Sequence, residues 1–82
     1  MSEQWLNCLV TKGMFTDEVV VIYAYGGRKW SAFVPRERVA LIADGHGRVR
    51  VTVFQSGGAS WAVLPSEDQT VIEIDERDLV AA

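Results

Sequence analysis

The sequence predicts a small, mainly β protein in which six short antiparallel strands close into a barrel or roll. Two observations lead to this prediction. A doubled glycine followed by tryptophan and then proline occurs twice, and a run rich in valine and aromatic residues precedes each copy. Six β-type segments are also separated by turn residues at short intervals. An open sheet of this size would leave two bare edges and one exposed apolar face, and closure removes them.

The first two segments predict strands over 5–15 and 19–25. Alternation places Leu6, Cys8 and Val10 on one face of the first strand, and Gly13 near its end marks a bend. The second strand is apolar on both faces, and its β-branched residues argue against a helix. A strand of this kind lies centrally in a sheet or meets another chain.

The first Gly-Gly pair, Gly26 and Gly27, supplies the positive φ angles that a two-residue hairpin turn needs. The chain is expected to return as a third strand over 28–34. Pro35 ends that strand because it has no amide hydrogen to donate. The segment 36–43 follows, and it is predicted to form one short helical turn.

The second half repeats this plan. The segment 48–54 has the cleanest alternation in the chain, and Val49, Val51 and Val53 are expected to point inward. Gly57 and Gly58 form the next hairpin turn. Further strands are predicted over 59–64 and 70–74, and a final short turn over 75–80.

We expect valine and indole side chains to fill the interior of this barrel. If the Trp61 ring lies there, Trp61→Ala should cost about 3–5 kcal/mol. The layout, with a short helical turn between strands, is similar to that of SH3-like small barrels. The resemblance concerns layout alone and implies a small closed β fold.

Length and composition predict one domain over 1–82 in a chain that is 49% hydrophobic. Cys8 is the only cysteine, so an internal disulfide is excluded. With His46 it makes too few ligands for a structural zinc site, and we expect neither a metal nor a cofactor. No secretory or membrane-spanning pattern is visible, and a lone cysteine suits a reducing compartment. We therefore expect a cytoplasmic protein that does not bind membranes.

The formal net charge of −3 is unevenly spread. Residues 1–18 carry −2, residues 19–66 carry +4 and residues 67–82 carry −5. Such asymmetry can mark a face that binds polyanions. It is also produced by basic and acidic strands that lie side by side and pair, and the sequence favours this second interpretation because surfaces usually mix both signs.

No catalytic residue is predicted, and whether the protein is an enzyme stays open with a leaning against it. Cys8 lies in an apolar strand with no adjacent base, which is typical of a buried, inert thiol. His46 lies between two glycines and is expected to be a solvated turn residue. The acidic cluster at Glu73, Asp75, Glu76 and Asp78 lacks the spacing of a calcium loop.

The preferred function is a non-catalytic binding module for proteins that also forms homo-oligomers. Tyr23 and Tyr25 on the two-sided apolar strand support it, because aromatic residues anchor interfaces. The second face of that strand is covered either by 36–43 or by another chain. The protein partner and the number of subunits are not specified by the sequence.

The alternative function is RNA or DNA binding by a small barrel. Arg48, Arg50 and Phe54 share the outward face of the fourth strand, and Arg28 and Lys29 are expected near them. Arginines beside an exposed aromatic ring suit stacking on bases and contact with phosphates. The negative net charge disfavours this alternative, since nucleic-acid-binding domains are usually basic.

Overall fold

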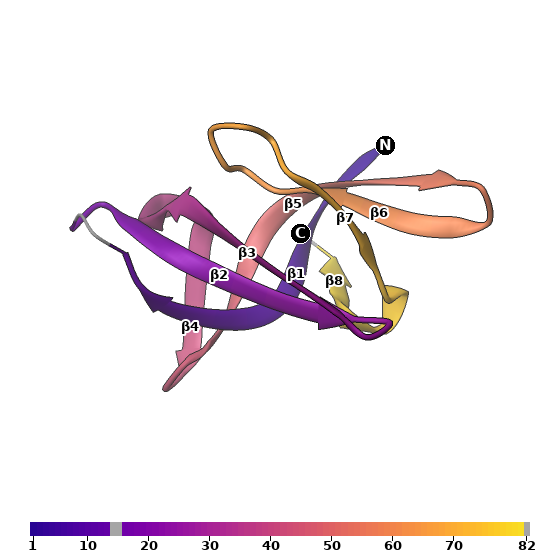
Figure 1. Cartoon of the computed structure of the whole chain (residues 1–82). Helices are drawn as coiled ribbons and strands as arrows, with labels where there is room; N and C mark the ends of the chain where they lie inside the picture. The colour runs from indigo at the N-terminus through magenta and orange to yellow at the C-terminus, as the bar shows by residue number, and fades with distance from the viewer. Residues whose placement is uncertain (14–15, 82) are drawn as a thin grey trace.

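The computed structural model describes residues 1–13 and 16–81, which form an antiparallel sheet rolled into a nearly closed barrel (Figure 1). The predicted mainly-β barrel is therefore confirmed. Two 3-10 turns, η1 (Arg36–Arg38) and η2 (Glu76–Asp78), interrupt the strands. The strands are β1 (Ser2–Lys12), β2 (Glu18–Tyr25), β3 (Arg28–Pro35), β4 (Val39–Ala43), β5 (His46–Ser56), β6 (Ala59–Val63), β7 (Val71–Ile74) and β8 (Leu79–Ala81).

Six strands follow one another in the order β3-β2-β1-β5-β6-β7, while β4 pairs with β5 and β8 pairs with β1. The long strands β1 and β5 hold the barrel together because each changes partner along one edge. β1 pairs with β2 from Leu9 to Lys12 and with β8 from Gln4 to Leu6. Its other edge pairs with β5 from Ser2 to Leu9.

The segment 36–43 differs from its prediction in part. A helical turn forms at Arg36–Arg38, but the next five residues form β4 on the edge of β5. Gly47 of β5 has no side chain, and this allows β4 to lie beside β5 at this position. A Cβ atom there would lie 2.8 Å from the Ala40 carbonyl oxygen and 2.9 Å from a methyl group of Val10. Pairing with β5 therefore prevails over the helical preference that the three-residue spacing of Val39 and Ile42 indicates.

Both Gly-Gly turns are confirmed. Gly26 and Gly27 have φ angles of 62° and 78°, and Gly57 and Gly58 have 62° and 77°. These left-handed values match the right-handed twist of the flanking strands, which is why two-residue hairpins favour glycine here. The first strand begins earlier than predicted, at Ser2, and its predicted end at Phe15 lies outside the described residues.

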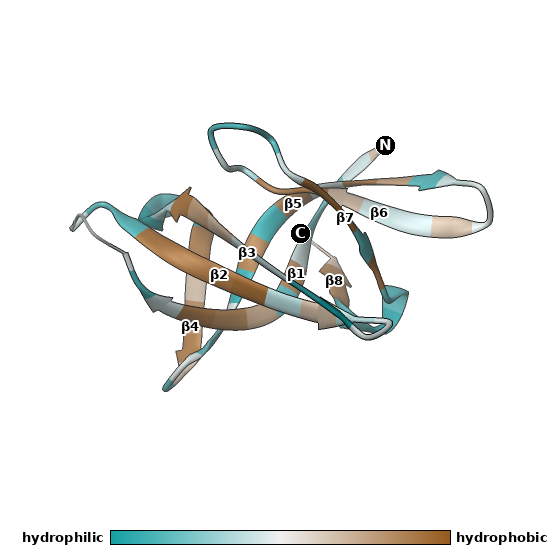
Figure 2. Ribbon diagram, in the orientation of Figure 1, coloured by the Kyte–Doolittle hydropathy of each residue, from teal (hydrophilic) through white to brown (hydrophobic). Residues whose placement is uncertain are grey.

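The core consists of aliphatic side chains and the Tyr23 ring on the inner face of the barrel. Val49, Val51 and Val53 are buried as predicted. Trp30 packs against this core and stacks on Tyr23, with ring centroids 6.4 Å apart. Figure 2 shows the hydrophobic colour over much of β2 and β4. The other buried apolar residues are Leu6, Val10, Val19, Val21, Val34, Ala62, Leu64, Ile72 and Ile74.

Candidate functional site

The strongest candidate site is the outer face of β1, β5 and β6, because its aromatic side chains lie outside the core. Strict alternation turns every second residue of these strands outward. Register then brings Trp5 opposite Arg50 and Phe54 opposite Trp61. We call these four residues, together with Glu3 and Val63, the outer aromatic face.

Arg50 is held in place on this face by two neighbours. Its guanidinium carbon lies 5.8 Å from the centroid of the Trp5 ring, within the range of a cation–π contact. Its Nε atom also forms an ion pair with Glu3. Arg48, one step along the strand, donates a 3.1 Å hydrogen bond from Nε to Oδ1 of Asn7. Both arginines are thus oriented by residues of β1.

Phe54 and Trp61 form the aromatic pair at the other end of the face. Trp61 is partly exposed, and its indole N–H donates a 3.1 Å hydrogen bond to the Ser56 carbonyl. The expected interior position of Trp61 is therefore wrong. Ser60 and Ala62 point inward from β6. Trp61 lies between them and therefore points outward, because successive side chains of a strand face opposite sides of the sheet.

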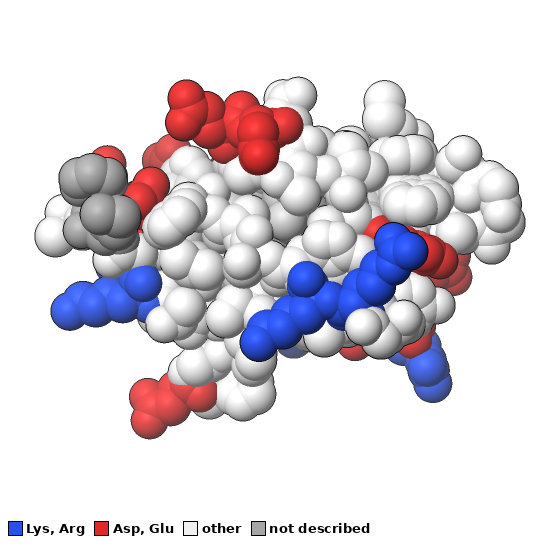
Figure 3. Space-filling view, viewed as in Figure 1, with Lys and Arg blue, Asp and Glu red and all other residues white. Residues whose placement is uncertain are grey.

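The structure separates the seven predicted binding residues. Arg48, Arg50 and Phe54 share the outer aromatic side of β5 as expected. Arg28 and Lys29 lie instead at the tip of the β2–β3 hairpin, where Arg28 pairs with Tyr25. In the view of Figure 3, the basic side chains lie in separate groups rather than in one patch.

The structure corrects the predicted position of Tyr23 on a binding face, because Tyr23 is 6% exposed and belongs to the core. Its hydroxyl donates a 2.6 Å hydrogen bond to Oδ2 of Asp78 and accepts a 2.9 Å bond from the Asp75 amide. Burial, with the Asp78 carboxylate adding to it, raises the pKa of this hydroxyl far above its usual value. Tyr23 thus ties η2 to the barrel. Tyr25, in contrast, is 37% exposed.

The outer side of β2 is only partly covered. Ile22 lines an open groove of about 580 Å³ together with Ile42 of β4, so the segment 36–43 supplies part of the cover. Leu9 borders the same groove and is 46% exposed. The sequence left open whether residues 36–43 or another chain covers this face of β2. Residues 36–43 cover part of it.

Cys8 and His46, which lie far apart in the chain, both line this groove. Their strands are adjacent, but Cys8 pairs with Gly47 and His46 pairs with Leu9, which puts the two side chains on opposite faces. Burial raises the pKa of the Cys8 thiol to about 11, against a smaller opposite effect of its hydrogen bond to Val49. Such a thiol is a poor nucleophile.

The acidic end of the chain has structural contacts of its own. Glu76 accepts a 2.7 Å hydrogen bond from Ser60, and Arg77 pairs with Asp75. Hydrogen bonds from Arg77 lower the pKa of Asp75. Within residues 1–13 and 16–81, neither of the ion pairs joins the acidic end to the basic middle. The pairing of neighbouring acidic and basic strands that the sequence favours is found instead between β1 and β5, where Glu3 pairs with Arg50.

Sequence reasoning missed Glu3, Trp5 and Trp61 as members of the site. Alternation alone places Trp5 on the outward side of its strand, but only the register with β5 puts it over Arg50. No helix in the described ranges is both long and apolar enough to cross a membrane. Comparisons with protein-family models, with curated proteins and with solved structures found no match.

Proposed function

We propose that the protein is a non-catalytic binding module that contacts protein through the outer aromatic face and forms a homodimer there. The observation that carries this proposal is the placement of Trp5, Phe54 and Trp61 on one sheet face, outside the core. Tryptophan, phenylalanine and arginine are enriched where proteins associate. A cytoplasmic location is part of the proposal, because the lone Cys8 suits a reducing compartment.

Charge on this face favours a second copy of the chain as the partner. Arg50 and Glu3 lie side by side at one end, and Glu73 is paired across from Trp61 at the other. A dimer with twofold symmetry brings a patch against itself, so the patch must be self-complementary. An apolar centre bordered by both signs of charge meets this requirement, since each arginine can face a carboxylate of the partner.

Sedimentation velocity over a range of protein concentrations tests the proposal. We expect the wild type to shift from monomer to dimer as concentration rises. Phe54→Glu should weaken the dimer by at least about tenfold, because it puts a charge into the aromatic part of the contact. Phe33→Glu is the matched control, since Phe33 is 50% exposed on β3, away from this face, and should leave the dimer intact.

Two results would contradict the proposal. The first is a wild type that stays monomeric at every concentration. The second is a dimer that Phe33→Glu weakens as much as Phe54→Glu does. Circular dichroism of both variants shows whether each keeps the β fold, so that loss of the dimer is not confused with unfolding.

One observation favours nucleic-acid binding as a second candidate function. Arg48 and Arg50 lie on the same outer side as Phe54 and the two tryptophans, and aromatic rings beside arginines can stack on bases. The ion pair with Glu3 reduces the charge available for phosphates. Fluorescence anisotropy with single-stranded oligonucleotides at low salt tests this function. It predicts binding that weakens steeply as salt is added, and no binding at low salt rejects it.

A further inference from the structure

A gap in the barrel separates β3 from β7, the two strands that end the strand order. Among the described residues, β3 pairs only with β2 and β7 pairs only with β6, so each has one unpaired edge. An open sheet edge presents backbone N–H and C=O groups that can accept another strand.

The hairpin register shows which groups of β3 face the gap. Tyr25 and Arg28 flank the two-residue turn and therefore form the hydrogen-bonded pair that closes the hairpin. Hydrogen-bonded and non-hydrogen-bonded pairs alternate along an antiparallel ladder. Ala32 is therefore bonded to β2, and the backbone groups of Ser31 and Phe33 point away from β2 to the free edge.

The same reasoning applies to β7. The Leu64 amide donates a 2.8 Å hydrogen bond to the Thr70 carbonyl, so Thr70 faces β6. Alternation then turns the backbone groups of Val71 and Glu73 toward the free edge of β7. Both sides of the gap thus offer backbone donors and acceptors.

One hydrogen bond shows that this edge of β7 is directed at the β2–β3 hairpin. The Asp75 amide has the same parity as Val71 and Glu73, and it donates to the Tyr23 hydroxyl of β2 at 2.9 Å. The Tyr23 side chain closes the gap at this end. Beyond it, no side chain of the described residues bridges β3 and β7 by a hydrogen bond.

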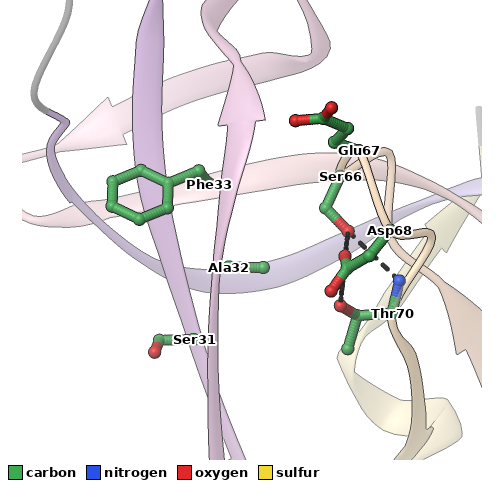
Figure 4. Close-up of a pocket in the computed structure, with 7 residues that line it drawn as sticks. All are labelled: Ser31, Ala32, Phe33, Ser66, Glu67, Asp68 and Thr70. Carbon is green, nitrogen blue, oxygen red and sulfur yellow. Dashed lines mark hydrogen bonds between the residues drawn. The ribbon is translucent and has the colours of Figure 1, made fainter.

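The open part of the gap is a hollow of about 500 Å³ between β3 and the loop before β7 (Figure 4). Ala32 points across it toward the loop, whereas Ser31 and Phe33 point to the other side of β3. The loop is held in shape because Asp68 accepts hydrogen bonds from Ser66 at 2.9 Å and from Thr70 at 2.8 Å. The hollow therefore has a firm wall and a small side chain on the opposite strand.

The surroundings of this hollow are acidic. Glu67 and Asp68 line it, and Asp17 and Glu18 line an adjoining hollow that shares Phe33 with it. No lysine or arginine is among the described residues that line either hollow. Figure 3 shows acidic side chains gathered at the top of the molecule, over the loop between β6 and β7. A ligand with positive charge is therefore favoured here.

We infer that the gap binds an extended peptide segment rich in lysine or arginine, which adds a strand between β3 and β7. Backbone hydrogen bonds to Ser31 and Phe33 supply the pairing, as in other cases of strand addition. Glu67 and Asp68 select basic side chains. This site does not depend on the outer aromatic face and takes a different partner.

Fluorescence anisotropy with a labelled peptide of alternating lysine and valine tests the inference. We expect saturable binding, and none with the counterpart in which glutamate replaces every lysine. Ser31→Pro should weaken binding by at least about tenfold, because it removes an edge donor without removing a bond to β2. Glu67→Gln should weaken binding about threefold, and Asp44→Asn, the charge-matched control in the β4–β5 turn, should not weaken it.

Amide hydrogen exchange locates the bound peptide. The Ser31 and Phe33 amides should exchange more slowly when the peptide is bound. Absence of binding, equal binding of the glutamate peptide, or protection confined to the outer aromatic face would each overturn the inference. Phe54→Glu should bind the peptide as the wild type does, so this site and the proposed dimer can fail separately.

Discussion

Tyr23→Phe is the most informative single substitution, because it removes one oxygen atom and keeps the ring in the core. The lost hydroxyl donates to the Asp78 carboxylate and accepts from the Asp75 amide. A hydrogen bond to a charged group contributes about 1.5–3 kcal/mol and a neutral one about 0.5–1.5 kcal/mol. Asp75 and Asp78 are partly exposed, so water replaces part of this loss. We expect a decrease of about 2 kcal/mol in the free energy of unfolding.

Urea denaturation followed by tryptophan fluorescence measures this change. In thermal unfolding, a loss of this size should lower Tm by about 10 °C for a domain of 60–100 residues. Tyr25→Phe is the matched control, since Tyr25 lies on the same strand but is 37% exposed. Equal stability of the two variants would refute the assignment of Tyr23 as the tie between η2 and the barrel.

The same hydroxyl predicts how stability depends on pH. Burial raises the pKa of Tyr23 in the folded protein, so the unfolded chain loses this proton first, near pH 10. The unfolded state then binds fewer protons than the folded state, and the free energy of unfolding falls as pH rises above about 10. The decrease should be smaller in Tyr23→Phe, and equal slopes for the two proteins would contradict the raised pKa.

Three further substitutions and one chemical reaction test the fold. In urea denaturation, Leu6→Ala, at a fully buried position, should lower the free energy of unfolding by about 3 kcal/mol. Trp61→Ala should lower it by only about 1 kcal/mol, because the Trp61 ring lies outside the core. The reverse order would contradict this placement. Cys8 should react with iodoacetamide at pH 8 at least about a hundredfold more slowly in the folded than in the unfolded protein, and equal rates would show that the thiol is not buried. Gly58→Ala should cost about 1–2 kcal/mol through its left-handed backbone alone, since the added Cβ meets no atom within 4 Å, and unchanged melting would contradict the turn geometry.

Local signals in the sequence account for most of the fold. The alternation over 48–54 correctly places Val49, Val51 and Val53 inside, because a strand with one buried face imposes a period of two. The Gly-Gly pairs correctly mark two hairpins, because few other residues adopt the required positive φ angles. Both signals arise within a few residues of the chain.

Long-range contacts account for what the sequence does not predict. Tyr23 and Tyr25 have the same parity on β2, yet only Tyr23 is buried, because η2 returns to it from 55 residues away. β4 forms by pairing with the start of β5, where Gly47 leaves room between Ala40 and the distant Val10 of β1. The outer aromatic face likewise depends on the register between β1 and β5, which alternation within each strand does not determine.

The three indole N–H signals in an NMR dilution series test most directly whether the outer aromatic face is where two copies meet. Trp5 and Trp61 lie on that face, while Trp30 packs against the core and serves as an internal control. We predict that the Trp5 and Trp61 signals move as the protein is concentrated and that the Trp30 signal stays in place. Signals of Trp5 and Trp61 that do not change with concentration would contradict the proposed interface.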